Sequence, residues 1–179
     1  FITAKGIIGT ETTIGGFMPY EKKFPVGYRI RKAMQYGNTL DEYVDILLNG
    51  NSGDYANSWL FGDINSNEIL RIELGLKYHN VERTKNGYFI GFNAPYDPQI
   101  RNLECNNSGM YDIRRHQGAR KVRLGDLMEE NKGNIDIDIA KKMQVKVIER
   151  KIKPTEMKKF VLNAYIDDDV KNWAFETLK

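Results

Sequence analysis

The chain of 179 residues is long enough for one domain with a hydrophobic core, and its 41% hydrophobic and 28% charged residues are ordinary for a globular protein. The 27 basic and 24 acidic residues leave a formal charge of +3, an excess too small to predict nucleic-acid binding. No apolar run approaches the roughly 20 residues that a membrane-spanning helix needs, so no transmembrane segment is predicted.

The first third of the chain predicts a bent hairpin followed by two helices. The run of β-branched residues over positions 1–14 predicts two short strands. Apolar residues at helical spacing predict a short helix over residues 28–36. The clearest helix covers residues 40–48, because Asn38 or Thr39 can cap its start and its first turn is acidic.

The middle of the chain has the alternation of apolar and polar residues that is typical of β-strands. The predicted strands cover residues 57–64, 68–76, 81–84 and 88–92. The Asn86-Gly87 pair predicts a tight type I′ hairpin between the last two strands. Alternating leucine and isoleucine in residues 68–76 indicates that one face of that strand is buried.

The last third of the chain returns to helical periodicity. The predicted elements are helices over residues 114–128 and from about Asn134, an edge strand over 145–152, and helices over 154–165 and 170–178. Antiparallel strands with helices packed on them define an α+β fold. The character of the sequence changes after about residue 142, so we expect residues 1–142 to belong to one domain and residues 143–179 to be an appended strand and helix segment of unassigned role.

Cys105 is the only cysteine, which excludes an internal disulfide and a cysteine-based zinc site. It lies in a predicted loop with no base nearby in the sequence, so a nucleophilic role is not expected. His116 has no second histidine or cysteine at ligand spacing, and His79 is interpreted as a structural histidine in a strand. The sequence therefore predicts no metal site, and no organic cofactor is expected.

Asn93 follows the predicted strand at residues 88–92 and stands two positions before Pro95. An asparagine at the end of a strand can point its amide N–H at a substrate oxygen, as an oxyanion hole requires. The same side chain can instead form an Asx turn ahead of the proline, which is the ordinary structural interpretation. Both interpretations stay open on the residues alone.

Two further groups of polar residues have a functional and a structural interpretation. Asn57 and Ser58, at the entry of a strand, predict either a substrate-pocket wall or a hydrogen-bonded junction that places Trp59 in the core. A charged cluster predicts either an arginine that binds a carboxylate or keeps a thiolate ionised, or a solvated helix face. Its members are Asp112, Arg114, Arg115, His116 and Arg120.

Four runs of sequence, taken together and in order, form a specific pattern. They are KGIIGTETTI at 5–14, GNSGDYANSWL at 50–60, NEI at 67–69 with ELGL at 73–76, and GFNAP at 91–95. In this order they resemble the phospholipase B-like proteins. More distantly they are similar to the group of choloylglycine hydrolase, penicillin V acylase and isopenicillin N acyltransferase. The resemblance covers roughly residues 1–142 and implies that they are the C-terminal portion of an N-terminal-nucleophile hydrolase domain.

The resemblance implies an N-terminal-nucleophile (Ntn) hydrolase fold, an αββα sandwich in which two antiparallel sheets lie between helical layers. In these families a precursor is cut to expose an N-terminal cysteine, and the α-amino group of that cysteine acts as the general base. The thiolate attacks an amide or ester carbonyl to form an acyl-enzyme, which water or another acceptor then releases.

The resemblance also implies which residues form the site. Asn93 would bind the tetrahedral oxyanion, and catalytic roles are expected for Asn93, Thr13 and Arg114. Substrate contacts are expected from Asn57, Trp59, Thr12 and Arg115. Thr12 is also the alternative to Thr13 if the register is shifted by one residue, and Arg115 is the alternative to Arg114.

The family nucleophile is expected upstream of Phe1, because the chain opens with strand-like residues and no initiator methionine. We therefore expect the substrate-pocket and oxyanion-hole part of a cysteine-dependent Ntn amide or acyl hydrolase, inactive by itself. Its partners would be the rest of the precursor and a small acyl-amide or lipid-like substrate. The alternatives are a catalytically inactive binding or scaffold module and an acyltransferase that uses the same site. A homo-oligomer is compatible with the sequence.

Overall fold

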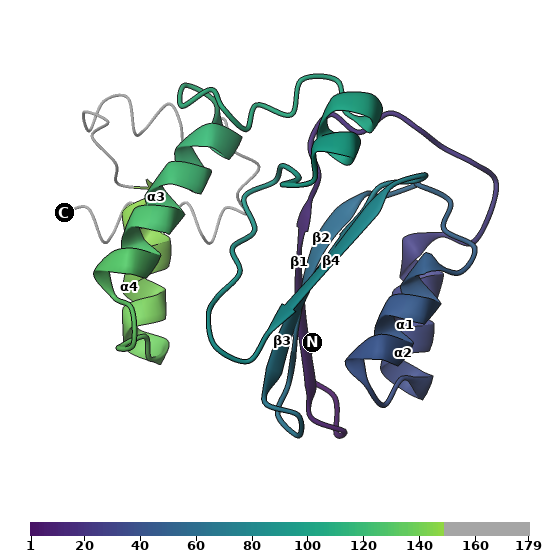
Figure 1. The fold of residues 1–179 in the computed structure, drawn as a ribbon, viewed down its shortest axis with the longest axis horizontal. Helices are drawn as coiled ribbons and strands as arrows, with labels where there is room; N and C mark the ends of the chain where they lie inside the picture. The colour runs from purple at the N-terminus through teal and green to yellow at the C-terminus, as the bar shows by residue number, and fades with distance from the viewer. Residues whose placement is uncertain (149–179) are drawn as a thin grey trace, which may run out of the picture. The chain divides into compact units, whose positions relative to one another are not determined.

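A computed structural model describes residues 1–148 of the chain (Figure 1). Contacts between Cα atoms divide the chain into two units, of which the first is Phe1–Gly125 and the second begins at Asp126. The helices predicted at 154–165 and 170–178 lie outside the described residues.

Helices and an antiparallel sheet together confirm the α+β fold class. In chain order the elements are β1 (Ile7–Thr13), α1 (Val26–Tyr36), α2 (Leu40–Leu48), β2 (Asn57–Asp63), β3 (Glu68–Leu74), β4 (His79–Thr84), the short π-helix η1 (Ile100–Glu104), α3 (His116–Glu130) and α4 (Ile137–Ile148). The predicted helix at 40–48 matches α2, and the predictions for α1, β2, β3 and β4 differ from the structure by only a few residues at their ends.

The four strands form one antiparallel sheet in the order β1-β2-β3-β4. Thr12 on β1 pairs with Ser58 on β2, which pairs with Glu73 on β3. Residues that face each other directly across antiparallel strands point to the same side of the sheet. These three polar side chains therefore share one face.

The first residues of the chain extend the sheet at the outer edge of β1. Ile2 forms an isolated antiparallel bridge with Ile8. Phe1 and Gly9 exchange both backbone hydrogen bonds, at 2.8 and 3.0 Å. The hairpin predicted over residues 1–14 is present in this short form.

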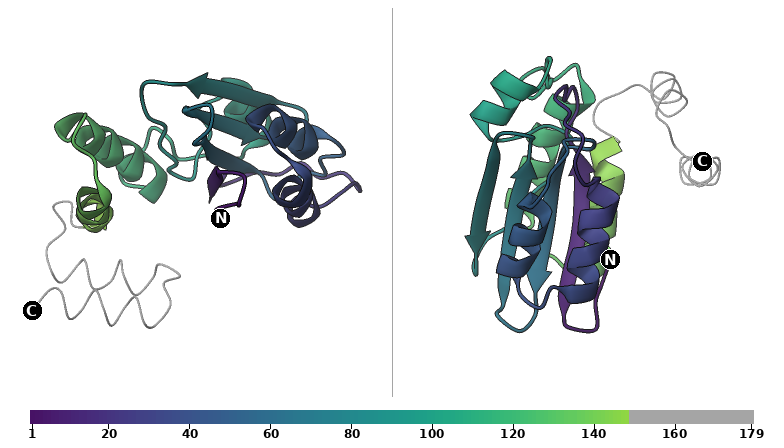
Figure 2. Two further views of the ribbon diagram at one scale, coloured as in Figure 1. Left: turned by 90° about the horizontal axis from the view of Figure 1, so that it is seen from below. Right: turned by 90° about the vertical axis from the view of Figure 1, so that its right-hand side faces the viewer.

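Helices α1 and α2 cover one face of the sheet (Figures 1 and 2). Leu70, Ile72 and Leu74 alternate along β3 and point to these helices, as the sequence pattern predicted. On β2 the rings of Trp59 and Phe61 stack 5.7 Å apart, and both belong to the same hydrophobic core. Apolar packing therefore holds α1 and α2 on this face of the sheet.

Thr39 is the cap of α2, which settles the choice between Asn38 and Thr39. Its Oγ1 accepts a hydrogen bond from the backbone N–H of Glu42 at 3.2 Å. The Glu42 carboxylate accepts in return from the backbone N–H of Asn38 at 2.6 Å. The first bond satisfies an amide group that the first helical turn leaves without a partner, and the second satisfies the amide group that precedes the cap.

Buried Arg29 on α1 fixes the loop that leads from α2 to β2. Its Nη2 donates to Oδ1 of Asn51 at 2.9 Å, and its Nε donates to the carbonyl of Phe24 at 3.1 Å. Asp54 accepts from the backbone N–H of Val26 at the start of α1, at 3.0 Å. Part of the GNSGDYANSWL run thus has a structural role in joining α1 to the sheet.

Residues 88–97 cross the opposite face of the sheet without forming a strand (Figure 1). The rings of Phe89 and Tyr96 lie against the guanidinium of Arg71 on β3, at 5.2 and 4.1 Å from ring centroid to Cζ. Gly91 lies against the side chain of Thr12, so closely that a Cβ at position 91 would come within 2.6 Å of it.

The predicted strand at 88–92 and the type I′ hairpin at Asn86-Gly87 are therefore wrong. A type I′ turn needs a positive φ at both central residues, and of the two only Gly87 has one, at 149°. The backbone N–H groups of Tyr96 and Asp97 donate to the Glu73 carboxylate at 2.8 and 2.7 Å instead of entering a ladder. Residues 1–148 thus contain a single sheet, and the second sheet of an αββα sandwich stays a prediction.

The later helices agree less closely with the sequence. α3 begins at His116, two residues after the predicted start. α4 continues to Ile148, so the edge strand predicted over 145–152 is wrong in its first part. A short mixture of apolar and charged residues does not distinguish a period of 2 from one of 3.6. The predicted domain boundary after residue 142 falls within α4 and stays a prediction.

Candidate functional site

Polar side chains gather at the end of the sheet where β1 ends and β2 begins. There Thr13, the last residue of β1, pairs with Asn57, the first residue of β2. We call the polar residues at this end the strand-end cluster. Its members are Thr12, Thr13, Asn57, Ser58, Glu73, Asn93 and Arg120.

Asn93 joins the loop after residue 92 to the end of β1. Its side-chain Nδ2 donates to the backbone carbonyl of Thr13 at 3.0 Å, and its backbone carbonyl accepts from the N–H of Gly15 at 3.0 Å. Its φ of 64° is a left-handed value that asparagine tolerates better than most residues. An amide nitrogen carries two hydrogens, so this arrangement fixes the carboxamide and leaves one donor for another acceptor.

Arg120 completes the fixation of Asn93 by donating from Nη1 to its Oδ1. The guanidinium is half-buried, and burial lowers the pKa of Arg120. Among residues 1–148 no carboxylate lies within ion-pair distance of it. Arg120 is therefore a cation next to the carboxamide of Asn93, and no carboxylate in the described part of the chain neutralises it.

Arg114, which the resemblance favoured, lies elsewhere. Its exposed side chain donates from Nε and Nη2 to the carboxylate of Asp112, at 2.9 and 3.0 Å. These hydrogen bonds lower the pKa of Asp112 to about 2. Arg115 donates to the carbonyl of Asn107 at 3.2 Å. The arginine that reaches Asn93 is Arg120, and the signal for it was weak because it is one of several basic residues in a short run.

The two threonines at the end of β1 have different surroundings. The Oγ1 atom of Thr12 is buried against Gly91 and has no hydrogen-bond partner among the described residues. The hydroxyl of Thr13 is hydrogen-bonded to the hydroxyl of Tyr55. Of the two, Thr12 points to the face that residues 88–97 cross, and Thr13 contributes its backbone carbonyl to Asn93.

Asn57 and Trp59 both point to the face that α1 and α2 cover. Asn57 is fully buried, and its Nδ2 donates to Glu11 at 2.8 Å while its Oδ1 has no partner in the described part of the chain. Trp59 packs between aromatic rings of the hydrophobic core. The junction interpretation of this segment agrees with these contacts, and no contact joins Trp59 to Asn93.

Glu73 is the residue of this region that sequence analysis missed. Its side chain is fully buried on β3 and accepts hydrogen bonds from Ser58 Oγ at 3.1 Å and from the backbone N–H groups of Tyr96 and Asp97. Burial raises the pKa of Glu73, and the hydrogen bonds and Arg71 oppose this rise. The overlooked signal was the position of a glutamate between Ile72 and Leu74 in a strand, which indicates that the second face of the sheet is polar.

Cys105 does not have the surroundings of a nucleophile. Burial raises the pKa of its thiol to about 12, and the neighbouring carboxylates of Glu104 and Glu73 add to the rise. A thiolate is the reactive form of cysteine, so very little of it forms near neutral pH. That Cys105 has no catalytic role stays a prediction.

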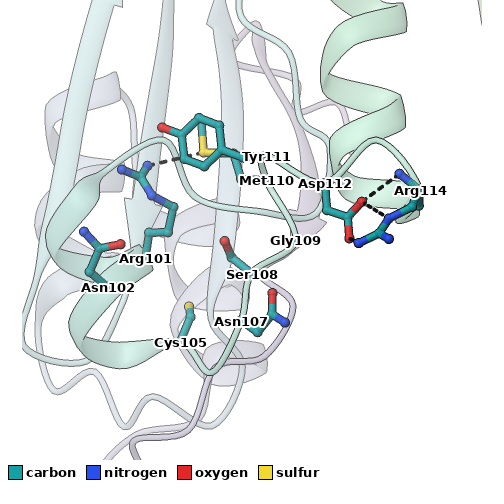
Figure 3. Close-up of a pocket in the computed structure, with 10 residues that line it drawn as sticks. All are labelled: Arg101, Asn102, Cys105, Asn107, Ser108, Gly109, Met110, Tyr111, Asp112 and Arg114. Atoms are coloured by element: carbon teal, nitrogen blue, oxygen red, sulfur yellow. Dashed lines mark hydrogen bonds and ion pairs between the residues drawn. The ribbon is translucent and has the colours of Figure 1, made fainter.

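The open cavities of the first unit include the following two. One of about 390 Å³ adjoins the strand-end cluster and is lined by residues 13–20 and 53–56, including Thr13 and Tyr55. The other, of about 660 Å³, is lined by residues between Arg101 and Arg114 (Figure 3).

Within residues 1–148, no group of three or more histidine, cysteine, aspartate or glutamate side chains could hold a metal ion. In the same part of the chain no helix has the length and apolar character to cross a membrane. No protein-family model matches this sequence, and no curated protein matches it significantly.

Proposed function

We propose that this chain supplies the oxyanion-binding and substrate-pocket groups of a cysteine-dependent Ntn amide or acyl hydrolase, whose nucleophile is carried by polypeptide upstream of Phe1. The observation that supports this most is the fixed carboxamide of Asn93. It is held from one side by the carbonyl of Thr13 and from the other by Arg120, with one Nδ2 hydrogen still available.

A donor fixed in this way suits transition-state stabilisation. The hydrogen bonds that orient Asn93 are made before any substrate arrives, so no reorganisation is needed as charge develops on a carbonyl oxygen. The hydrogen bond from Arg120 to Oδ1 draws electron density from the amide and strengthens its remaining N–H as a donor. The proposed site therefore combines Asn93 as oxyanion donor with Arg120 as its positioning residue.

The pairing at the edge of β1 supports a nucleophile upstream of Phe1. Because Phe1 pairs with Gly9, a strand that continued upstream in the same register would bring its third residue before Phe1 opposite Thr12. That residue would point to the same face as Thr12, next to Gly91 and the loop that carries Asn93. A cysteine there would lie beside the strand-end cluster.

The proposed reaction uses such an N-terminal cysteine. Its α-amino group titrates near neutrality and can take the thiol proton, and the thiolate then attacks the amide or ester carbonyl. Asn93 would bind the oxyanion of the tetrahedral intermediate. The leaving amine or alcohol departs with the proton from the α-ammonium group, and water then hydrolyses the acyl-enzyme to the free acid. No metal or organic cofactor enters these steps.

A second candidate function is a catalytically inactive binding module with the same fold. It is favoured by the hydrogen bond from Asn93 to Thr13, because that bond alone gives Asn93 a structural reason to be where it is. An acyltransferase would use the same acyl-enzyme with an amine acceptor in place of water. Product analysis with and without an added amine separates hydrolase from transferase.

The experiment uses the polypeptide with its upstream sequence, after mass spectrometry has established whether its mature N-terminus is a cysteine. Asn93→Ala should lower kcat by about 10²–10³-fold. Asn67→Ala is the matched control, because Asn67 also has a left-handed backbone, with a φ of 54°, but lies exposed in the turn between β2 and β3. Equal kcat values in the two variants, or a mature N-terminus other than cysteine, would mean that the proposed function is wrong.

A further inference from the structure

The larger of the two cavities described above, of about 660 Å³, lies beside η1 and the loop that follows it (Figure 3). Its volume is in the range of sites that hold small organic ligands. Arg101 and Tyr111 lie on one side of the hollow, and Asp112 and Arg114 lie on the other (Figure 3). The two arginines have different partners, and this difference indicates what the cavity could bind.

Arg114 is neutralised by its neighbour. The edge of its guanidinium formed by Nε and Nη2 faces both oxygens of the Asp112 carboxylate, at 2.9 and 3.0 Å. Two parallel N–H groups on one edge match the two oxygens of a carboxylate, and this geometry is the strongest that arginine offers to an anion. Asp112 is the one acidic residue among the ten that line the cavity, and Arg114 already occupies it.

Arg101 has the same edge without a partner. Its Nη1 donates to the carbonyl of Tyr96 at 2.7 Å and lies 3.3 Å from the sulfur of Met110. Its Nε and Nη2 donate to no atom of residues 1–148. The hydrogen bonds at Nη1 hold the guanidinium in place, so its second edge is oriented before a ligand binds.

The surroundings of Arg101 add positive charge and apolar surface. The guanidinium lies 5.3 Å from the centroid of the Tyr111 ring, and Nζ of Lys121 lies 4.7 Å from the same centroid. No ion pair of Arg101 or Lys121 occurs among the described residues. Tyr111 is exposed, so its ring offers apolar surface next to the cation.

We propose that this cavity binds a small organic monocarboxylate. The carboxylate would accept two parallel hydrogen bonds from Nε and Nη2 of Arg101, and an apolar substituent would lie against the exposed ring of Tyr111. One carboxylate group is enough to occupy this edge, and the corresponding edge of Arg114 is already bound to Asp112 and offers no second site of the same kind. The proposal concerns binding alone and holds whether or not the chain belongs to a hydrolase.

The test is calorimetric titration of the 179-residue chain with phenylacetate as the probe. Arg101→Gln should weaken binding at least tenfold, and Arg101→Lys should weaken it nearly as much, because lysine keeps the charge but has no two-donor edge. Arg31→Gln is the matched control, since Arg31 is exposed on α1 away from the cavity residues, and it should bind like the unchanged chain. Phenylacetamide, which has no charge, should bind at least tenfold more weakly than phenylacetate.

A second variant protects the test against loss of folding, because Arg101 also holds loop carbonyls. Asn102→Trp places a large ring at an exposed position of the cavity lining, leaves Arg101 unchanged, and should abolish phenylacetate binding at an unchanged thermal midpoint. The proposal is wrong if phenylacetate does not bind at millimolar concentration or if Asn102→Trp binds it normally. It is also wrong if Arg31→Gln weakens binding as much as Arg101→Gln, or if phenylacetamide or inorganic phosphate binds as tightly as phenylacetate.

Discussion

The two faces of the sheet hold their covering layers by different interactions. On the face under α1 and α2, apolar side chains such as Ile72 and Phe61 interlock with the helices. On the opposite face, Glu73 and Arg71 hold the segment 88–97 through backbone hydrogen bonds and ring contacts. The first layer is regular secondary structure, whereas the second is irregular chain.

This difference explains where the candidate site lies. A face covered by packed helices is filled mainly by apolar side chains, as Trp59 and Phe61 fill it here. A face covered by irregular chain can place backbone and side-chain donors at chosen points, as Asn93 and Arg120 do at the end of β1. The chain that covers the polar face forms no regular hydrogen-bond ladder, and it instead presents donors in fixed orientations.

The largest expected effect is on the apolar face. Phe61 is 2% exposed and packs against Trp59, Tyr43 and Phe1. Phe61→Ala should therefore lower the free energy of unfolding by about 3–5 kcal/mol, measured by urea denaturation. Ile8→Ala is the control on the opposite face, where Ile8 is 43% exposed, and it should cost less than about 1 kcal/mol. Similar losses in the two variants would contradict the contrast between the faces.

The second prediction concerns the pH dependence of the polar face. Burial raises the pKa of Glu73 in the folded chain, so its ionised form is disfavoured there relative to the unfolded chain. The contribution of Glu73 to stability is then complete below its unfolded pKa, near 4.5, and is lost as the pH rises through its folded pKa. The unfolding free energy of the unchanged chain should fall relative to that of Glu73→Gln as the pH is raised.

The measurement is urea denaturation of both chains from about pH 4 to about pH 8, where the chain with glutamate loses stability relative to the one with glutamine. A difference between the two chains that is independent of pH would mean that Glu73 titrates normally. A difference that grows in the opposite direction would mean that its backbone hydrogen bonds, and not burial, dominate its pKa.

The sequence predicted the apolar face well because that face obeys a repeating pattern. Leu70, Ile72 and Leu74 alternate, and α2 carries an acidic first turn and a capping residue, so period and boundaries follow from local chemistry. The strand predicted at 88–92 failed because the hydrogen bonds of the loop that follows go to a buried carboxylate far away in sequence. No local sequence pattern predicts these long-range hydrogen bonds.

For the candidate site, local sequence gave the position of Asn93 but not its partners. Its contacts to Thr13 and Arg120 span 80 and 27 residues, and neither separation corresponds to a spacing rule of helices or strands. The resemblance favoured Arg114 because Tyr111-Asp112 precedes it and Arg120 follows at the expected interval. Only the folded chain distinguishes an arginine that faces Asn93 from one that binds an adjacent aspartate.

The smallest expected effect lies outside both faces, at the exposed pair of Asp112 and Arg114. Arg114→Gln removes the guanidinium that lowers the pKa of Asp112, so that pKa should rise from about 2 toward its ordinary value of 3.8, measured by NMR titration of the side-chain carboxyl. Asp112 keeps the hydrogen bond from the backbone N–H of residue 114 at 3.0 Å, so the rise should be incomplete. The stabilising effect of this pair is present above the unfolded pKa and fades as the pH falls toward 2. Because both groups contact water, the thermal midpoint near neutral pH should not change measurably. A clear fall in that midpoint would show that an exposed ion pair holds this loop as firmly as buried Glu73 holds residues 96 and 97, and the contrast between buried and exposed polar groups would then be lost.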